Sequence, residues 1–338
     1  MQVYTSWPGL DKYQIAVQSP ENFLRDPRLK KSSVERKGIF PCTRSGNFGT
    51  VYKFIEPNGK KWALKVFTKL IPQRQQRYTM LSEWLVNLKM RSMLWFEYQP
   101  EGILIDGTWY PALLMEWGNG ETLMDYFKLQ FEEKFQEVDN FTLTENWIRL
   151  MEDLSNASMA HGDLQHGNIL LCPDKSFVLV DYDGMYVPSM KGEKALELGL
   201  TDYQHPQRDD SFFNNQLDDF SALVVLFQMM IINPGLWMTF HQEDEYLIFQ
   251  RSDIQDPDNS PLLKEMRKGT LSAKIKRAAE ILTEACKGRI EDVPPFSFLV
   301  EEINRSRRVA QAVPSYQEKA KPKEPATSDV QEIGRAHV

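Results

Sequence analysis

The pattern of apolar and polar residues predicts β-strands in the first third of the chain. Two runs, residues 37–54 and 61–67, are rich in β-branched, aromatic and aliphatic residues. They flank the turn sequence EPNGK, so they predict a β-hairpin. Residues 102–117 resemble two further strands joined at Asp106 and Gly107. This part of the chain is therefore expected to form an antiparallel sheet.

Helical periodicity dominates the remainder of the chain. Residues 145–160 are amphipathic, and residues 72–88 and 262–308 show similar spacing of apolar positions. The apolar run Ala222–Ile232 predicts a buried helix, because it is shorter than the ~20 residues of a membrane span. For residues 1–33 we expect a short helix and an extended strap across the next unit. The whole pattern predicts the α+β class and no membrane partner.

Composition is that of an ordinary globular protein. Of the 338 residues, 42% are hydrophobic and 26% are charged, which suits one large domain or two lobes. Cys42, Cys172 and Cys286 are odd in number and far apart. This argues against a disulfide framework or a zinc site and favours a reducing, cytoplasmic location. The first residues lack a basic region followed by an apolar one, so no signal peptide is expected.

Charge is distributed unevenly along the chain. Residues 1–80 contain fifteen Lys or Arg against five Asp or Glu, a net charge of +10, so the rest carries −17 of the total of −7. One interpretation is a solvated surface with uneven charge. The other is that the basic part faces nucleotide phosphates while the acidic part attracts Mg²⁺ or basic substrates. No basic stripe is interleaved with aromatic residues, so no nucleic-acid partner is expected.

Side chains that could take part in catalysis or metal binding are concentrated in two stretches. These are HGDLQHGN, residues 161–168, and VLVDYDG, residues 178–184. The first stretch lies between a predicted helix and the strand-like run NILLC, so we expect it to be a loop. Phosphoryl transfer to a hydroxyl needs a carboxylate that orients the acceptor oxygen, and oxygen ligands that hold Mg²⁺ against nucleotide phosphates. Asp163 suits the first role, and Asn168 with Asp181 suits the second.

Two other interpretations of these residues are weaker. His161, His166 and His205 are either metal ligands or core histidines, and without a cysteine or an HExxH arrangement the core interpretation is preferred. The run DYDG is similar to the start of an EF-hand loop, but the Glu that such a loop needs downstream is absent.

The two stretches resemble the catalytic loop and the metal-binding motif of protein kinases and their small-molecule kinase relatives. In that family His-x-Asp is followed by Asn five positions on, and a DFG-like triplet comes roughly a dozen residues later. His161, Asp163 and Asn168 stand in this order, and Asp181 opens the triplet DYD thirteen positions after Asn168. The resemblance covers roughly residues 34–308 and implies a two-lobed fold that binds ATP and Mg²⁺ between its lobes.

A glycine-containing run upstream resembles the later part of the kinase motif GxGxxGxV, although Arg44 takes the place of the first glycine. Glycines at this spacing let backbone amides approach phosphates. A hairpin turn that happens to contain glycine is the alternative. The resemblance implies that the following residues contact the nucleotide: Gly46, Asn47, Phe48, Gly49 and Val51.

Lys65 in WALKVF resembles the lysine of the family's V-A-I-K signature, which binds the α and β phosphates. A lysine on an apolar strand needs a charged partner. Glu83 is the only acidic residue of the next predicted helix, so we expect a Lys65–Glu83 ion pair, with a solvent-facing Glu83 as the alternative. Glu116 and Trp117 resemble the hinge whose backbone groups bind adenine; ordinary core-strand residues are the alternative.

Further motifs follow the triplet. Residues 184–205 correspond to the family's activation segment. Gln207 stands where the family has a glutamate that pairs with a buried arginine, and residues 291–298 lack that arginine. Asp218 or Asp219 resembles the aspartate that ties the central helix to the catalytic loop.

The expected organisation is a strap over residues 1–33, a lobe of antiparallel sheet plus one helix over 34–117, and a mainly helical lobe over 118–308. Residues 309–338 are rich in Pro, Lys and Glu and are expected to be a disordered linker. The last seven residues, EIGRAHV, match a translated sequencing adaptor and are excluded from fold reasoning. We therefore expect the natural chain to continue, with room for a further C-terminal domain.

The expected activity is Mg²⁺-dependent transfer of the γ-phosphoryl group of ATP to Ser or Thr hydroxyls of a protein substrate. Asp163 would orient the acceptor, and Lys65 held by Glu83 would bind the phosphates. HGDLQHGN also resembles the HGDLHxGN of antibiotic and choline kinases, so an aminoglycoside- or choline-like phosphotransferase is the alternative. A third possibility is a nucleotide-binding pseudokinase scaffold without turnover, suggested by Arg44 and Gln165.

Overall fold

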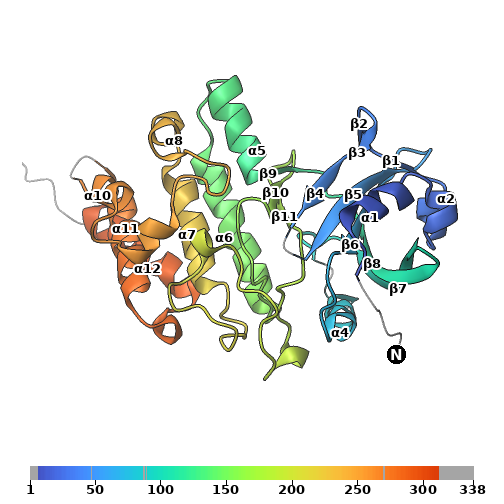
Figure 1. Ribbon diagram of the computed structural model, residues 1–338. Helices are drawn as coiled ribbons and strands as arrows, with labels where there is room; N and C mark the ends of the chain where they lie inside the picture. The colour runs from blue at the N-terminus through green and yellow to red at the C-terminus, as the bar shows by residue number, and fades with distance from the viewer. Residues whose placement is uncertain (1–6, 47, 87, 89, 269–270, 312–338) are drawn as a thin grey trace, which may run out of the picture.

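A six-stranded antiparallel sheet forms the first part of the chain, and helices form most of the rest (Figure 1). The computed structural model describes residues 7–46, 48–86, 88, 90–268 and 271–311, so most of the predicted linker lies outside it. The predicted α+β class is confirmed. The strand order is β1-β5-β6-β8-β7, with β4 also paired to β5. The strands are β1 (Ser33–Val34), β4 (Thr43–Ser45), β5 (Gly49–Ile55), β6 (Lys61–Phe67), β7 (Phe96–Ile105) and β8 (Thr108–Glu116).

Both predicted hairpins are present. The one around EPNGK is β5 and β6, in which Gly49 lies opposite Phe67, and Gly59 turns the chain at φ 87°. The second is β7 and β8, joined at Asp106 and Gly107. These two residues have φ values of 49° and 79°. Positive φ at both central residues is what a two-residue turn of type I′ requires.

The single strand-like run predicted over residues 37–54 is broken in the structure. Short strands β2 (Arg36–Lys37) and β3 (Phe40–Pro41) form a separate hairpin before β4 and β5. Gly38 reverses the chain at φ 65°, and Pro41 lacks the N–H group that continued pairing needs. Apolar composition predicted the strand content here but not these interruptions.

Three short helices cover one face of the sheet (Figure 1). The Tyr13 hydroxyl donates to the backbone oxygen of Phe67 at 2.9 Å, and Leu24 forms a β-bridge with Ile103. A buried core joins these helices to the sheet through side chains such as Tyr52. We expected one short helix and an extended strap over residues 1–33; the described residues from 7 onward instead form three short helices. The helices are α1 (Leu10–Ala16), α2 (Pro20–Phe23) and α3 (Pro27–Lys30).

Helix α4 (Arg74–Val86) packs on the other face of the sheet and falls within the helix predicted over residues 72–88. Alternate side chains of β8 explain the two faces, since successive residues of a strand point in opposite directions. Leu114 belongs to the core under the strap, whereas Leu113 belongs to the core shared with α4 and the helical part.

The helical part is built around α7 (Asp219–Ile231), which is buried on nearly all sides as its sequence predicts. Trp147 of α6 (Asn140–Asn156) lies against it and donates its Nε1–H to the Ala222 carbonyl at 3.1 Å. No helix among the described residues combines the length and apolarity needed to cross a bilayer. Around this pair lie the other helices α5 (Leu123–Lys128), α8 (Pro234–Phe240), α9 (Arg251–Gln255), α10 (Pro261–Met266), α11 (Ala273–Lys287) and α12 (Phe296–Gln311).

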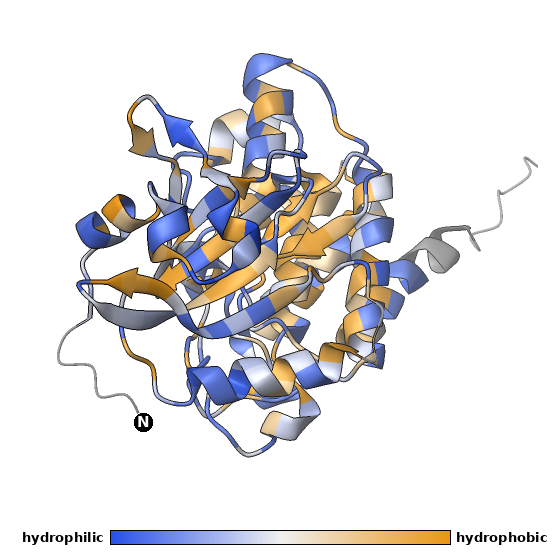
Figure 2. Ribbon diagram, turned by 90° about the vertical axis from the view of Figure 1, so that its right-hand side faces the viewer, coloured by the Kyte–Doolittle hydropathy of each residue, from blue (hydrophilic) through white to orange (hydrophobic). Residues whose placement is uncertain are grey.

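A small sheet lies between the large sheet and the helices, and it carries the candidate site (Figure 1). Its order is β11-β10-β9, with β9 (Glu121–Thr122), β10 (Ile169–Leu171) and β11 (Phe177–Leu179). The loop of residues 161–168 enters β10, and the DYDG run leaves β11. Figure 2 shows that apolar residues gather in the strands and helices at the middle of the molecule, so both stretches start from rigid, buried elements.

Candidate active site

The 161–168 loop is fixed at its start by the first turn of α7. Asp218 accepts hydrogen bonds from the backbone N–H groups of His161 and Gly162, the second at 2.8 Å. Burial raises the pKa of this carboxyl group. Of the two aspartates offered by the sequence, Asp218 therefore ties the central helix to the loop. Asp219 instead accepts from the N–H of Phe296 at 2.9 Å.

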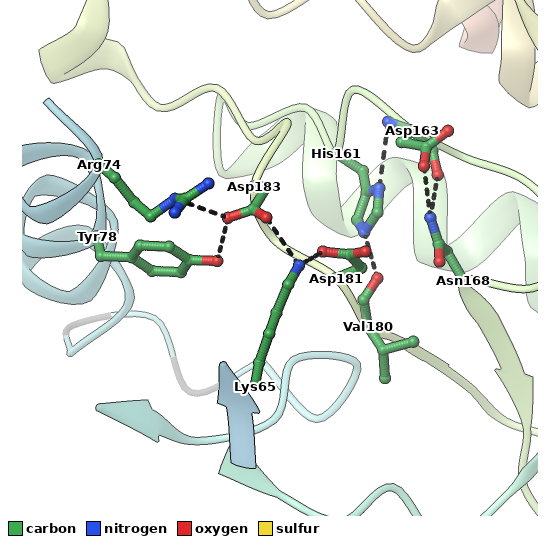
Figure 3. A network of polar contacts seen from close by, with 9 residues as sticks. All are labelled: Lys65, Arg74, Tyr78, His161, Asp163, Asn168, Val180, Asp181 and Asp183. Atoms are coloured by element: carbon green, nitrogen blue, oxygen red, sulfur yellow. Dashed lines mark hydrogen bonds and ion pairs between the residues drawn. The ribbon is translucent and has the colours of Figure 1, made fainter. Parts of the chain in front are cut away.

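The loop also packs directly against the DYDG segment. The Nε2–H of His161 donates to the Val180 carbonyl at 3.0 Å, and Nδ1 accepts from the Asp163 N–H at 3.3 Å (Figure 3). Gly162 has φ 81°, and a Cβ there would lie 2.2 Å from the Gly184 oxygen. Only glycine fits this backbone contact. These contacts bring the loop of Asp163 and the segment of Asp181 side by side.

Asp163 is held in one orientation by two donors. The Nδ2 of Asn168 donates to its Oδ2 at 2.8 Å, and the Leu200 N–H donates to its Oδ1 at 2.7 Å. Asn168 also donates to the Asp163 carbonyl at 3.0 Å. Burial raises the pKa of Asp163. Because the side-chain NH₂ group of Asn168 donates both of these hydrogen bonds, its side-chain carbonyl oxygen is the atom that suits a metal.

Lys65 meets two carboxylates of the DYD triplet. Its Nζ lies 2.5 Å from Asp181 Oδ1 and 2.7 Å from Asp183 Oδ2 (Figure 3). Burial acts against the charged amine, but the two carboxylates outweigh it and raise the pKa of Lys65. Lys65 and Asp181 are thus in contact, although 116 positions separate them in the sequence.

The predicted Lys65–Glu83 ion pair is wrong. Glu83 is exposed and forms no ion pair with any residue that the structure describes. The face of α4 that points toward Lys65 carries Tyr78, and at 3.6 residues per turn Glu83 lies about 140° around the helix from it. The buried partner is Asp183, which our sequence analysis missed. The signal was a second aspartate where the kinase triplet has glycine.

The glycine-containing run lies over this cluster. A Cβ on Gly46 would lie 4.0 Å from Asp181 Oδ2, and one on Gly49 would lie 2.5 Å from the Val66 oxygen. Val51 pairs with Lys65 in the β5–β6 register. Asn47 lies outside the described residues, and the Phe48 carbonyl accepts from Thr68 N–H at 3.0 Å. The run therefore covers the same space that Lys65 and Asp181 border.

The hinge candidates lie at the end of β8. The Glu116 N–H donates to the Trp95 carbonyl at 2.9 Å, and the Trp117 N–H donates to the Lys61 carbonyl at 3.3 Å. Both N–H groups are thus used within the protein. A base bound at this edge has to use other backbone groups.

One further carboxyl group, that of Glu197, lies near the cluster. It belongs to residues 184–205, the segment that follows the DYD triplet. Burial, followed by the charges of Asp181, Asp183 and Asp163, raises the pKa of Glu197 to about 9. A Cβ on Gly184 would lie 2.8 Å from its Oε1. These surroundings favour the neutral form of Glu197, and no local sequence pattern marked it.

Gln207 forms an uncharged contact. It lies where the family has a Glu–Arg ion pair that the sequence predicts to be absent from this chain. Its Oε1 accepts from the Ile290 N–H at 3.3 Å, beside the 291–298 region. An amide to backbone hydrogen bond thus joins the two segments that a charged pair joins in the family.

The three histidines offered as metal ligands or core residues are core residues. Each has a ring nitrogen bonded to a backbone carbonyl, which can only accept a proton. The contacts are His161 to Val180 at 3.0 Å, His166 to Asp244 at 3.1 Å and His205 to Ala285 at 3.0 Å.

Acid is expected to destabilise the protein through His166. Burial lowers its pKa from 6.5 to about 4, and its Nδ1 accepts from the Tyr203 hydroxyl at 2.9 Å. The unfolded chain binds a proton below pH 6.5 while the folded one does not, so stability falls as pH falls from about 6.5 to about 4. The expected loss between pH 7 and pH 5 is roughly 1–2 kcal/mol.

Urea unfolding at both pH values measures this loss. His166→Gln keeps hydrogen-bonding groups but removes the titration, so the wild type should lose more stability than the variant. Equal losses in the two proteins would contradict the assignment of His166 as a buried neutral ring.

Oxygen donors at the site suit Mg²⁺. The Asp181 side chain is 37% exposed, and the Asn168 carbonyl oxygen is free of the hydrogen bonds described above for its amide group. Mg²⁺ prefers hard oxygen ligands and is commonly held by one or two protein groups together with phosphates and water. The residues present therefore fit the ion.

No protein-family model matches the chain, and no curated protein matches it significantly.

Proposed function

We propose that this chain is an ATP- and Mg²⁺-dependent phosphotransferase with a two-lobed, protein kinase-like fold. The sheet part over residues 34–117 would be the small lobe, and residues 118–308 the large one. Its acceptor would be a Ser or Thr hydroxyl of a protein. The observation that carries the proposal is the convergence of four side chains from distant parts of the sequence: Lys65, Asp163, Asn168 and Asp181.

Each part of the site has a task in binding the nucleotide. Lys65 supplies a buried positive charge for the phosphates, and Gly46 and Gly49 let the backbone approach them. Asp181 and Asn168 would hold Mg²⁺, which neutralises charge on the phosphates. Such a site accelerates transfer mainly by positioning and by fixed charges.

Asp163 would handle the proton of the acceptor. Its oxygens accept from Asn168 and Leu200, and each carboxylate oxygen has a second lone pair for the substrate hydroxyl. As the acceptor oxygen forms its bond to the γ-phosphorus, the bond to the bridging oxygen breaks and ADP leaves. The hydroxyl proton passes to Asp163, whose pKa is raised by burial and so favours this.

A small-molecule acceptor is the second candidate, and one observation favours it. Protein kinases commonly have a lysine at the position of Gln165. Here the Gln165 Oε1 accepts from the Gly167 N–H at 2.6 Å, so the side chain folds back onto its own loop. This position therefore places no cation beside Asp163.

Incubation with γ-labelled ATP and Mg²⁺ tests the proposal and separates these acceptors. Label on the protein itself or on a generic basic protein supports a protein kinase, and label only on aminoglycoside or choline acceptors supports the second candidate. Nucleotide binding without transfer supports a scaffold. No nucleotide binding at all in calorimetry would overturn every version.

Removal of the metal is expected to stop transfer. Excess chelator takes away the ion that Asp181 and Asn168 would hold, so label incorporation should fall to background and return when Mg²⁺ is added back. Unchanged incorporation in chelator would contradict the assigned metal ligands. Heat-denatured protein serves as the background control.

A further inference from the structure

Asp183 is the most firmly held carboxylate at the site. Its side chain is 5% exposed. One oxygen lies 2.7 Å from Lys65 Nζ, and the other accepts from the Tyr78 hydroxyl at 2.7 Å, with Arg74 Nε at 4.0 Å (Figure 3). Two positively charged side chains, Lys65 and Arg74, thus face this carboxylate. It therefore joins strand β6 to helix α4.

Asp181 also contacts Lys65, but it differs from Asp183 in its exposure and in having no contact with α4 among the described residues. Its side chain is 37% exposed, it lies under Gly46, and it has the positive φ of 66°. Non-glycine residues adopt such a conformation uncommonly, in turns and at strained functional positions. Its contact with Lys65 is the only polar contact of its side chain recorded among the described residues. Asp181 is thus the carboxylate that can turn to a metal ion.

The charges of the buried cluster show why two carboxylates are present. Lys65 and Arg74 are balanced by Asp181 and Asp183. When Asp181 binds a metal, Lys65 still needs an anionic partner, because an unpaired buried charge is costly. Asp183 is unable to leave Lys65 easily, since Tyr78 and Arg74 hold it from α4.

We propose that Asp183 is the positioning residue of Lys65: it keeps the amine aimed at the phosphates and links it to α4, while Asp181 releases the amine to bind metal. The proposal rests on the proposed function and assigns to Asp183 the role that the sequence had suggested for Glu83. Through Asp183, any displacement of α4 moves Lys65 within the site.

Nucleotide binding in the presence of chelator isolates the contribution of Lys65. The dissociation constant of ATP is measured by calorimetry for the wild type, Asp183→Asn and Asp181→Asn. These variants make the same chemical change two positions apart, and both residues touch Lys65. If Asp183 orients Lys65, Asp183→Asn weakens binding by roughly tenfold or more, as expected for the loss of a hydrogen bond between charged groups. Asp181→Asn is expected to tighten metal-free binding, because it removes a negative charge near the phosphates and leaves Asp183 in contact with Lys65.

A purely electrostatic role gives a different result. Each substitution removes one negative charge near the phosphates, so both variants would then bind ATP more tightly than the wild type. That outcome overturns the proposal. With Mg²⁺ present, Asp181→Asn alone should lose the gain in affinity that the metal provides.

A second, milder variant tests the proposal even if Asp183→Asn does not fold. It removes a single hydroxyl group that contacts Asp183. Tyr78→Phe keeps the ring but removes the bond to Asp183, and a weakening of about two- to tenfold is expected. Tyr52→Phe is the matched control, because this phenol is buried on the opposite face of the sheet and its hydroxyl has no partner among the described residues. It should bind ATP as the wild type does.

The outcomes separate this proposal from the proposed function. If the wild type binds ATP and both Tyr78→Phe and Asp183→Asn bind it equally well, Asp183 does not position Lys65 and the function stands. If Asp183→Asn fails to fold by circular dichroism, Tyr78→Phe decides. If the wild type binds no nucleotide, the function and this proposal fail together.

Discussion

Replacement of Asp163 by Asn lowers phosphoryl transfer by about 10²- to 10⁴-fold, the range typical for loss of a positioned proton acceptor. The change removes the group that takes the hydroxyl proton, and it also leaves either Asn168 Nδ2 or the Leu200 N–H facing another donor. Asp163 contacts Asn168 and Leu200 and not the cluster around Lys65 that would bind the phosphates (Figure 3). The affinity for ATP should therefore stay near the wild-type value. Single-turnover rates and calorimetric ATP binding measure the two effects separately.

A carboxylate far from the site provides the control for this result. Asp174 is exposed in the turn between β10 and β11, where it accepts hydrogen bonds from Ser176. Asp174→Asn makes the same chemical change and should transfer phosphoryl groups at the wild-type rate. Undiminished transfer by Asp163→Asn would show that another group orients the acceptor.

Asp218→Asn is expected to destabilise the protein by about 2–4 kcal/mol and to abolish most of the activity. The carboxylate accepts from two backbone N–H groups, those of His161 and Gly162, and it is fully enclosed. An Asn side chain has one oxygen and one NH₂ group, so one buried N–H is left facing another donor. The loop that carries Asp163 then loses its attachment to α7.

The neighbouring residue on the same helix is the matched control. Asp219 accepts a single hydrogen bond, from the Phe296 N–H, and burial raises its pKa to about 7. Asn resembles its protonated form, so Asp219→Asn should cost less stability than Asp218→Asn and leave transfer intact. Urea unfolding gives the stabilities. Similar losses of stability and activity in the two variants would contradict a special role for Asp218 in holding the loop.

Local sequence patterns predicted most of the fold because they reflect local physics. The hairpins follow from strand-forming runs around turn residues, and α7 follows from an apolar run that cannot be exposed. Asp163, Asn168 and Asp181 were predicted as a group because they lie on one loop and on the strand exit beside it. Backbone contacts such as Gly162 against Gly184 then force them together.

The partner of Lys65 was not predicted because it depends on how α4 is rotated about its axis. In the structure Glu83 is not on the same face as Tyr78 and Leu81, two of the buried residues of α4, and spacing alone does not say which face turns inward. Glu197 was missed for a different reason. It lies in an irregular segment, where no periodicity indicates which side chains turn inward.

The strap also has a consequence for the order in which the protein is made. Leu24 is fully buried and pairs with Ile103, which the ribosome adds about 80 residues later. At roughly 5–20 residues per second, the buried side chains of the strap wait several seconds for the strand that they cover. The strap residues, although they are made first, thus reach their final contacts only after β7 of the six-stranded sheet has been made.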